Sequence, residues 1–339
     1  MSGAEYWIPI IWSGIAAIAI LTYILLDGFD LGIGILFAVE KNPTHRNIML
    51  NTIAPIWDGN ETWMVLGGAT LFGVFPMAYS IILSAFYPVI ITMLLALIFR
   101  GVAFEFRFKV HSPQAREYWG FAFMAGSCLT AFCQGIVLGA LIQGITIDGQ
   151  HFAGSHYEWL TPFSLLCGFS VIVGYALLGS TWLIMKTEGA LAEYNRKLSW
   201  LLTALLVICI GIVSLWTPFL NETYMRNWFS WPHILFVLPV PLCVVLAAFG
   251  VYFGIYHKLH AMPFFCSLFL FFLCFSGLGI SIWPYIVPPS ITIWEASSSP
   301  YSQGFLLFGT AILLPLILIY TLYSYWVFRG KVTEHDFYH

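Results

Sequence analysis

The chain has 339 residues, of which 60% are hydrophobic and 9% are charged, and its formal net charge is −3. Because a soluble domain carries about 25% charged residues, this composition excludes an ordinary soluble enzyme and indicates a polytopic helical membrane protein. The small net charge gives no reason to expect a nucleic-acid partner.

Nine apolar stretches are long enough to cross a membrane, which takes about 20 residues in a helix. Their approximate ranges are 8–38, 50–74, 79–108, 118–141, 161–186, 198–218, 232–256, 263–285 and 304–328. We therefore expect an all-α integral membrane protein that forms one membrane domain over 1–339. Within it we expect a first four-helix bundle over 8–141, a second over 161–285 and a peripheral helix over 304–328.

The basic residues gather in alternate connections between these spans. One set of connections, with the tail after the last span, holds Lys41, Arg46, Arg107, Lys109, Arg116, Lys186, Arg196, Lys197, Lys258, Arg329 and Lys331. The opposite set holds only Arg226, and Arg100 lies inside the third span. Since Lys and Arg accumulate on the cytoplasmic side, we expect the N-terminus outside, the C-terminus in the cytoplasm and an odd number of spans.

Two carboxylates lie within the second apolar stretch, in the motif WDGNETW at 57–63. A charge at the bilayer centre costs about 2.5–3.5 kcal/mol even on insertion scales. Asp58 and Glu61 are three residues apart and share a helix face. That face must meet protein, water or a counter-charge.

Further charges are predicted at the same depth of the membrane. Asp27 and Asp30 come late in the first span, and Arg100 and Glu105 come late in the third. Because buried carboxylates exchange protons with water, we interpret Asp58, Glu61 and Asp27 as a proton path. A structural ion-pair cluster is the alternative interpretation. The residues expected to supply the counter-charge or a structural support are Arg100, Asp30, Glu105, Trp57, Asn60 and Trp63.

The histidines lie in the connections and the tail, and only His233 enters an apolar stretch, at its edge. A membrane haem needs His or Met ligands that project inward, so we expect no haem ligated by this chain, no metal site and no catalytic residue. The seven cysteines all lie in apolar stretches without a C-x-x-C spacing. We interpret them as small hydrophobic residues.

Three segments carry a family resemblance, namely LDGFDLGIG at 26–34, PIWDGNETW at 55–63 and RGVAFEFR at 100–107. Weaker marks are KTEG at 186–189, PYIVP at 284–288 and TIWEA at 292–296. With its spacing, the set resembles subunit II of cytochrome bd-type quinol oxidases. The resemblance covers most of the chain, although its specific motifs lie in the first 110 residues. The segment at 100–109 and the Ser-Pro loop after it favour the cyanide-insensitive branch.

The resemblance implies a respiratory complex in the bacterial inner membrane that oxidises quinol and reduces oxygen to water. It implies a heterodimer with subunit I, which holds two b-type haems and one d-type haem. It also implies that the acid of the DGNE motif, here Asp58 with Glu61 beside it, lies on a cytoplasmic proton route to the oxygen-reducing haem. A small single-helix subunit and a bound lipid or quinone belong to the same expectation, although no residue here carries them over.

Two other functions remain open from the residues. A proton-coupled transporter would use Asp58, Glu61 and Arg100 at its substrate site, but transporters of this kind place broken helices near the midplane. Here the charges lie toward one side and only in the first three spans. A purely structural scaffold for subunit I would use the same carboxylates without titrating them.

Overall fold

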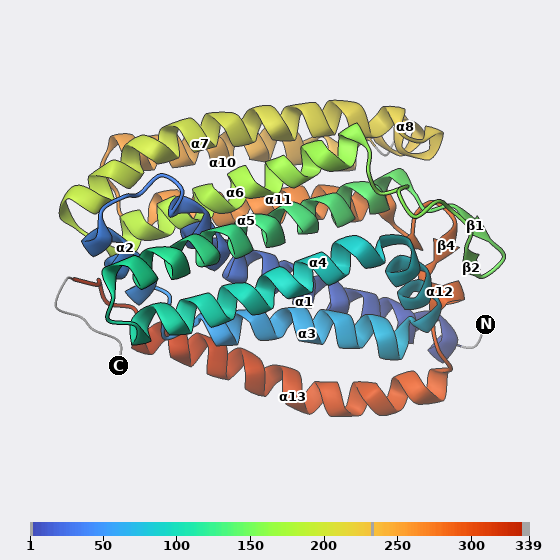
Figure 1. Ribbon diagram of the computed structural model, residues 1–339. Helices are drawn as coiled ribbons and strands as arrows, with labels where there is room; N and C mark the ends of the chain where they lie inside the picture. Colours follow the sequence, from blue (N-terminus) through green and yellow to red (C-terminus); the bar gives the residue numbers. More distant parts are fainter. Residues whose placement is uncertain (1–2, 232–233, 334–339) are drawn as a thin grey trace.

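The computed structural model describes residues 3–231 and 234–333, and long helices make up most of it (Figure 1). The helices of the first half are α1 Gly3–Leu36, α2 Pro43–Asn51, α3 Trp57–Val74, α4 Pro76–Lys109, α5 Pro113–Gln143 and α6 Pro162–Lys186. Those of the second half are α7 Gly189–Trp216, the 3₁₀ helix η1 Thr217–Phe219, α8 Glu222–Phe229, α9 Ile234–Val237, α10 Pro239–Tyr256, α11 Met262–Ile282, α12 Ile293–Ala296 and α13 Pro300–Val327. Proline stands in the first turn of many of them, where its missing N–H is not needed.

Eight of the described helices are long and apolar enough to cross a membrane, namely α1, α4, α5, α6, α7, α10, α11 and α13. The one remaining predicted span, the second in chain order at 50–74, corresponds to the end of α2, a turn and α3. The 18 residues of α3 rise about 27 Å, close to the thickness of a bilayer core. It carries the acids Asp58 and Glu61 and does not reach the apolar composition required of the eight, although it lies among them (Figure 1).

The helices pack in two groups. In the first, α1, α3, α4 and α5 form a ring in which each contacts the next and α5 returns to α1. In the second, α6, α7, α10 and α11 do the same, and α13 packs against α1 and α3. These contacts favour the predicted bundles, whose boundaries stay a prediction.

The two groups meet along α6, which packs against both α5 and α1. A Cβ atom added at Gly32 would lie 1.9 Å from the carbonyl oxygen of Tyr175, so the two backbones touch there. Small residues allow such an approach between membrane helices. Gly68 on α3 makes no such contact, since an added Cβ atom would meet nothing within 4 Å there. The crossing brings the aromatic rings of α6 beside the acids of α1.

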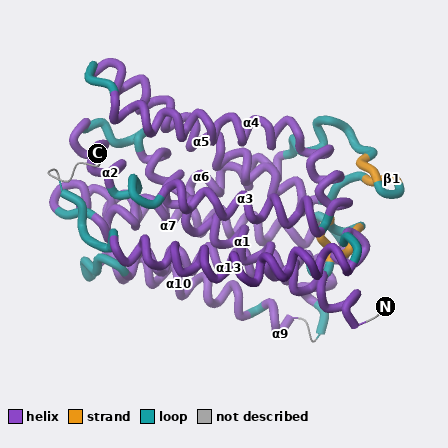
Figure 2. Tube along the Cα trace, turned by 90° about the horizontal axis from the view of Figure 1, so that it is seen from below, coloured by secondary structure: helices purple, strands orange, loops and turns teal. Residues whose placement is uncertain are grey.

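The short strands lie at the end of the molecule where α1 begins (Figure 2). Strands β1 Ile147–Asp148 and β2 His151–Phe152 pair antiparallel, as do β3 Tyr285–Val287 and β4 Ile291–Thr292. Helix α13 ends at the opposite end of the molecule (Figure 1). The start of α1 and the end of α13 therefore lie at opposite ends, as an odd number of spans requires. Which end faces the cytoplasm stays a prediction.

Candidate functional site

Arg100 on α4 and Asp27 on α1 form an ion pair inside the first helix group. Arg100 Nη1 donates to Asp27 Oδ1 over 2.9 Å, and the two side chains are 1% and 0% exposed. The same Nη1 lies 3.9 Å from Glu61 Oε2 on α3. One guanidinium nitrogen thus meets carboxylates from two other helices, which is the geometry that a counter-charge needs.

Asp30, one turn further along α1, has a neutral partner. Asn60 Nδ2 on α3 donates to Asp30 Oδ2 over 2.7 Å and reaches the Leu26 carbonyl oxygen over 3.4 Å. Asn60 Oδ1 in turn accepts a hydrogen bond from Tyr325 Oη on α13 over 2.8 Å. Asp30, Asn60 and Tyr325 therefore form a hydrogen-bonded chain that links three helices.

Asp58 lies on the outer face of α3 and is exposed. Within the described residues, no hydrogen bond or ion pair of its side chain is found. Glu61, three residues on, is 29% exposed and sits between Asp58 and the buried guanidinium of Arg100. The predicted proton-path residues thus run from the interior at Asp27 to the surface at Asp58.

Glu105 lies outside this cluster. Its side chain is half exposed, and its carboxylate is 3.7 Å from Lys109 Nζ one helical turn away. Trp57 lies beside the cluster, with its ring centroid 6.0 Å from the Arg100 Cζ atom. Trp63 is buried against Ala19 and Tyr23 of α1. The two tryptophans of the motif therefore flank the acids from different sides.

Several buried polar atoms of the cluster make no hydrogen bond to another described residue. They are Asp27 Oδ2, Asp30 Oδ1, Arg100 Nε and Arg100 Nη2. Buried polar atoms in proteins are nearly always hydrogen-bonded, often to ordered water. Two acceptors and two donors in one layer therefore give the cluster the capacity to hold water between its charges.

A second hydrogen-bonded chain escaped the sequence-based predictions. Tyr175 Oη on α6 donates to Gln134 Oε1 on α5, and Gln134 Nε2 donates to Tyr23 Oη on α1, each over 2.7 Å. Tyr23 lies one helical turn before Asp27. The amide of Gln134 inside an apolar stretch was a usable signal, whereas Tyr325 had none, because 265 residues separate it from Asn60.

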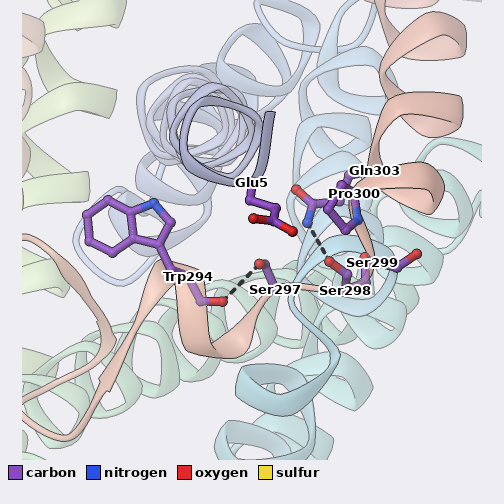
Figure 3. Close-up of a pocket in the computed structure, with 7 residues that line it drawn as sticks. All are labelled: Glu5, Trp294, Ser297, Ser298, Ser299, Pro300 and Gln303. Atoms are coloured by element: carbon purple, nitrogen blue, oxygen red, sulfur yellow. Dashed lines mark hydrogen bonds between the residues drawn. The ribbon is translucent and has the colours of Figure 1, made fainter. Parts of the chain in front are cut away.

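Two surface cavities lie away from the charged cluster. One, of about 350 Å³, is lined by Glu5, Trp294, residues 297–300 and Gln303 at the end where α1 begins (Figure 3). There Gln303 Nε2 donates to the Ser298 carbonyl oxygen (Figure 3). The other, of about 430 Å³, lies between α2, the α6–α7 connection and residues 332–333. Neither is lined by a predicted site residue.

Potential metal and haem ligands are dispersed. Within residues 3–231 and 234–333, no three His, Cys, Asp or Glu side chains gather as metal ligands would. The seven cysteines are free thiols. His233, at the edge of an apolar stretch, lies outside the described residues.

Known proteins resemble this chain over nearly its whole length. The family model for the cytochrome bd terminal oxidase subunit II matches residues 8–328. The cytochrome bd-I ubiquinol oxidase subunit 2 of Escherichia coli K12 is 29% identical, over 96% of this chain and 95% of the relative. The corresponding subunit 2 of Bacillus subtilis is 27% identical, over 96% and 97%.

A solved structure has the same fold. The bd oxidase from Geobacillus thermodenitrificans aligns with a TM-score of 0.73 and 17% identity, covering 94% of this chain and 98% of that one. The family match spans nearly the whole length of the chain, including all three charged motifs and the last helix. The chain belongs to the cytochrome bd terminal oxidase subunit II family.

Proposed function

We propose that Asp58, Glu61 and Asp27 carry cytoplasmic protons through this subunit II of a cytochrome bd quinol oxidase, toward the haem that reduces oxygen. The observation that carries the proposal is the position of Glu61, between the buried Arg100–Asp27 pair and the exposed carboxylate of Asp58. Carboxylates that can be protonated, with water between them, are the usual components of proton relays in membranes. Membership of this family excludes the alternative of a proton-coupled transporter.

The direction of the route follows from the position of Asp58. Further along α3 the exposed side chains of Val65 and Phe72 are apolar, as are those of Leu95 and Ile98 on α4. An exposed carboxylate in such a surface is costly against lipid. We therefore assign this face to the contact with subunit I, where Asp58 passes its proton to the partner.

The haems of the complex need ligands that this chain does not present. Of the described histidines, none lies within a membrane-length helix, since they fall in α2, in connections or at helix ends. The described residues thus do not fit axial ligation of a haem. We assign haem b and haem d to subunit I, and quinol oxidation to the complex as a whole.

The proposed orientation places the N-terminus outside and the C-terminus in the cytoplasm of the bacterial inner membrane. A small single-helix subunit, a bound lipid or quinone and membership of the cyanide-insensitive branch stay predictions. The relatives from Escherichia coli and Bacillus subtilis are subunits of ubiquinol oxidases, and for this chain we propose a quinol as the substrate of the complex.

Replacement of Asp58 by Asn in the assembled complex tests the proton role. The amide keeps the shape of the side chain but cannot carry a proton. We expect oxygen reduction and proton uptake to fall by about 10²-fold, the lower end of what removing a positioned proton-transfer group costs. Haem content should stay unchanged. Asp148→Asn is the matched control, because Asp148 is an exposed acid in β1 at the opposite end of the molecule.

The outcomes separate conduction from scaffolding. If Asp58→Asn keeps normal turnover, normal proton uptake and full haem content, the proton route is refuted and the subunit acts as a structural scaffold. Slow turnover with full haem content supports the proton route. If Asp58→Asn loses haem, Glu61→Gln repeats the test at a site inside the chain.

A further inference from the structure

Helix α13 lies at the periphery of the molecule, yet one of its side chains reaches the charged cluster. Along the whole helix only Gln303 is fully buried. Near its other end, Tyr325 Oη donates to Asn60 Oδ1 over 2.8 Å. The Tyr325 ring stands edge-on to Phe29 and Trp182, with centroid distances of 6.5 Å and 6.4 Å. Together with Phe29 and Trp182, Tyr325 forms an aromatic layer next to Asp30.

The Asp30 carboxylate and the Tyr325 hydroxyl both fit the observed orientation of the Asn60 amide. With Oδ1 held by a phenol donor, the Nδ2–H groups of Asn60 point at Asp30 Oδ2. The opposite amide orientation would set Oδ1 against a carboxylate oxygen. Asn60 gives the only hydrogen bond that Asp30 receives from a described side chain. The state of Asp30 therefore depends on this amide.

The residues that follow α13 tie the helix end to the second helix group. In this C-terminal strap (328–332), the carbonyl oxygens of Phe328 and Gly330 both accept from Lys186 Nζ at the end of α6. The Val332 N–H donates to the Lys186 carbonyl oxygen over 2.8 Å. Both the ammonium group and the backbone carbonyl of Lys186 therefore hydrogen-bond to the strap.

Two further contacts connect the strap with the aromatic layer. Lys331 Nζ lies 2.9 Å from Glu188 Oε1, and this hydrogen bond lowers the pKa of the Glu188 carboxyl. Lys186 Nζ also lies 5.3 Å above the ring of Trp182, which stacks on Phe29 at 4.3 Å. Lys186 therefore contacts both the strap and the layer that Tyr325 enters.

We propose that Tyr325 is a positioning residue for the Asn60–Asp30 pair and that the C-terminal strap, fastened to Lys186, keeps it in place. The proposal rests on the proposed proton function and adds Asp30 to it as a group whose protonation Asn60 and Tyr325 control. A phenol hydroxyl both donates and accepts. Tyr325 can therefore hold the amide in either orientation as Asp30 loses or gains a proton.

The test uses the assembled oxidase with four single variants and one double variant. Tyr325→Phe removes only the hydroxyl, and Lys186→Met removes the charge that holds the strap. The matched controls are Tyr323→Phe, on the exposed side of α13, and Lys197→Met, exposed on α7. The double variant combines Tyr325→Phe with Lys186→Met.

Proton uptake after an oxygen pulse is measured against pH, per haem. We expect Tyr325→Phe and Lys186→Met each to slow uptake about fivefold, the factor that matches one net hydrogen bond. The groups that face Asp30 and also enter the pH profile are Asp27 on α1, Glu61 on α3, Arg100 on α4 and Tyr325 on α13. Both controls should keep the wild-type rate and profile.

Two further measurements distinguish positioning from general stability. The infrared carboxyl band of Asp30, assigned with Asp30→Asn, should shift in both variants. In the double variant uptake should stay near fivefold slower, because both changes act through one contact, whereas independent effects would multiply to about 25-fold. An unchanged Asp30 band in Tyr325→Phe, or multiplied effects in the double variant, would overturn the proposal.

The proposed function fails in a different way. If Asp58→Asn leaves uptake unchanged, the proton route itself is wrong. If Asp58→Asn slows uptake while Tyr325→Phe keeps the wild-type rate and band, only the positioning role is wrong. Tryptic cleavage after Arg329 supplies a separate check on the strap, since Lys186→Met should speed it and Lys197→Met should not.

Discussion

Replacement of Arg100 by Gln tests whether the buried ion pair holds the first helix group together. Arg100 is the only cation within ion-pair distance of Asp27 among the described residues, and both side chains are at most 1% exposed. Breaking a buried pair by removing one partner costs about 3–5 kcal/mol, because an uncompensated charge stays behind. We expect Arg100→Gln to lower the free energy of unfolding by that amount.

Replacement of Asp27 by Asn should be milder, because the two partners are not equivalent. Without Asp27, the guanidinium of Arg100 keeps Glu61 at 3.9 Å. We expect the loss to be about 1.5–3 kcal/mol, the contribution of one hydrogen bond to a charged group. The double variant Asp27→Asn with Arg100→Gln leaves neither charge of the pair behind. Its loss should be smaller than the sum of the two single losses.

The assay is denaturant unfolding of the purified complex, followed by tryptophan fluorescence at one protein concentration. Lys109→Met on α4 is the control. Its ammonium is 71% exposed and pairs with Glu105 across one turn, so the change should stay within about 0.5 kcal/mol. The reasoning is refuted if Arg100→Gln costs no more than Asp27→Asn, or if the double variant loses the full sum.

Two further predictions concern the helix crossing and the strap. Gly32→Ala should destabilise the protein by about 1–3 kcal/mol in the same unfolding assay, because the new methyl group meets the Tyr175 carbonyl oxygen and α1 must move from α6. Gly14→Ala, where an added Cβ atom meets nothing within 4 Å, should cause no loss. The pKa of Glu188 is lowered, so its pair with Lys331 fully stabilises the strap at pH values above the ordinary carboxyl pKa of about 4.3. This stabilisation is lost as the pH falls through the lowered pKa. Hydrogen exchange of the Val332 amide, corrected for its intrinsic rate, should show this loss, and Glu188→Gln should abolish the pH dependence; a wild-type profile in that variant would contradict the assignment.

The burial of Asp27 and the exposure of Asp58 place these two acids in different surroundings. Asp27 pairs with Arg100 inside the chain, whereas Asp58 is exposed. A carboxylate of the second kind is stable in a membrane only when another molecule covers it. We therefore propose that subunit I covers Asp58.

Much of the fold follows from the sequence alone. Hydropathy is a local property, so the apolar stretches marked the eight membrane-length helices and the position of α3, with ends up to nine residues from those of the structure. The same reading put Asp27, Asp30, Asp58, Glu61 and Arg100 in one layer, because depth along a helix follows from counting residues at 1.5 Å each. The family motifs in the first 110 residues identified the family.

The partners within that layer were decided by the tertiary structure. Arg100 pairs most closely with Asp27, and Glu105 pairs with Lys109 outside the cluster. Tyr325, on the last helix, hydrogen-bonds to Asn60. Depth along a helix does not tell which way a side chain points around it. In a soluble helix an apolar stripe marks the inner face, but a membrane helix is apolar on all sides. The direction of Arg100, Glu105 and Tyr325 therefore became known only when the helices were packed together.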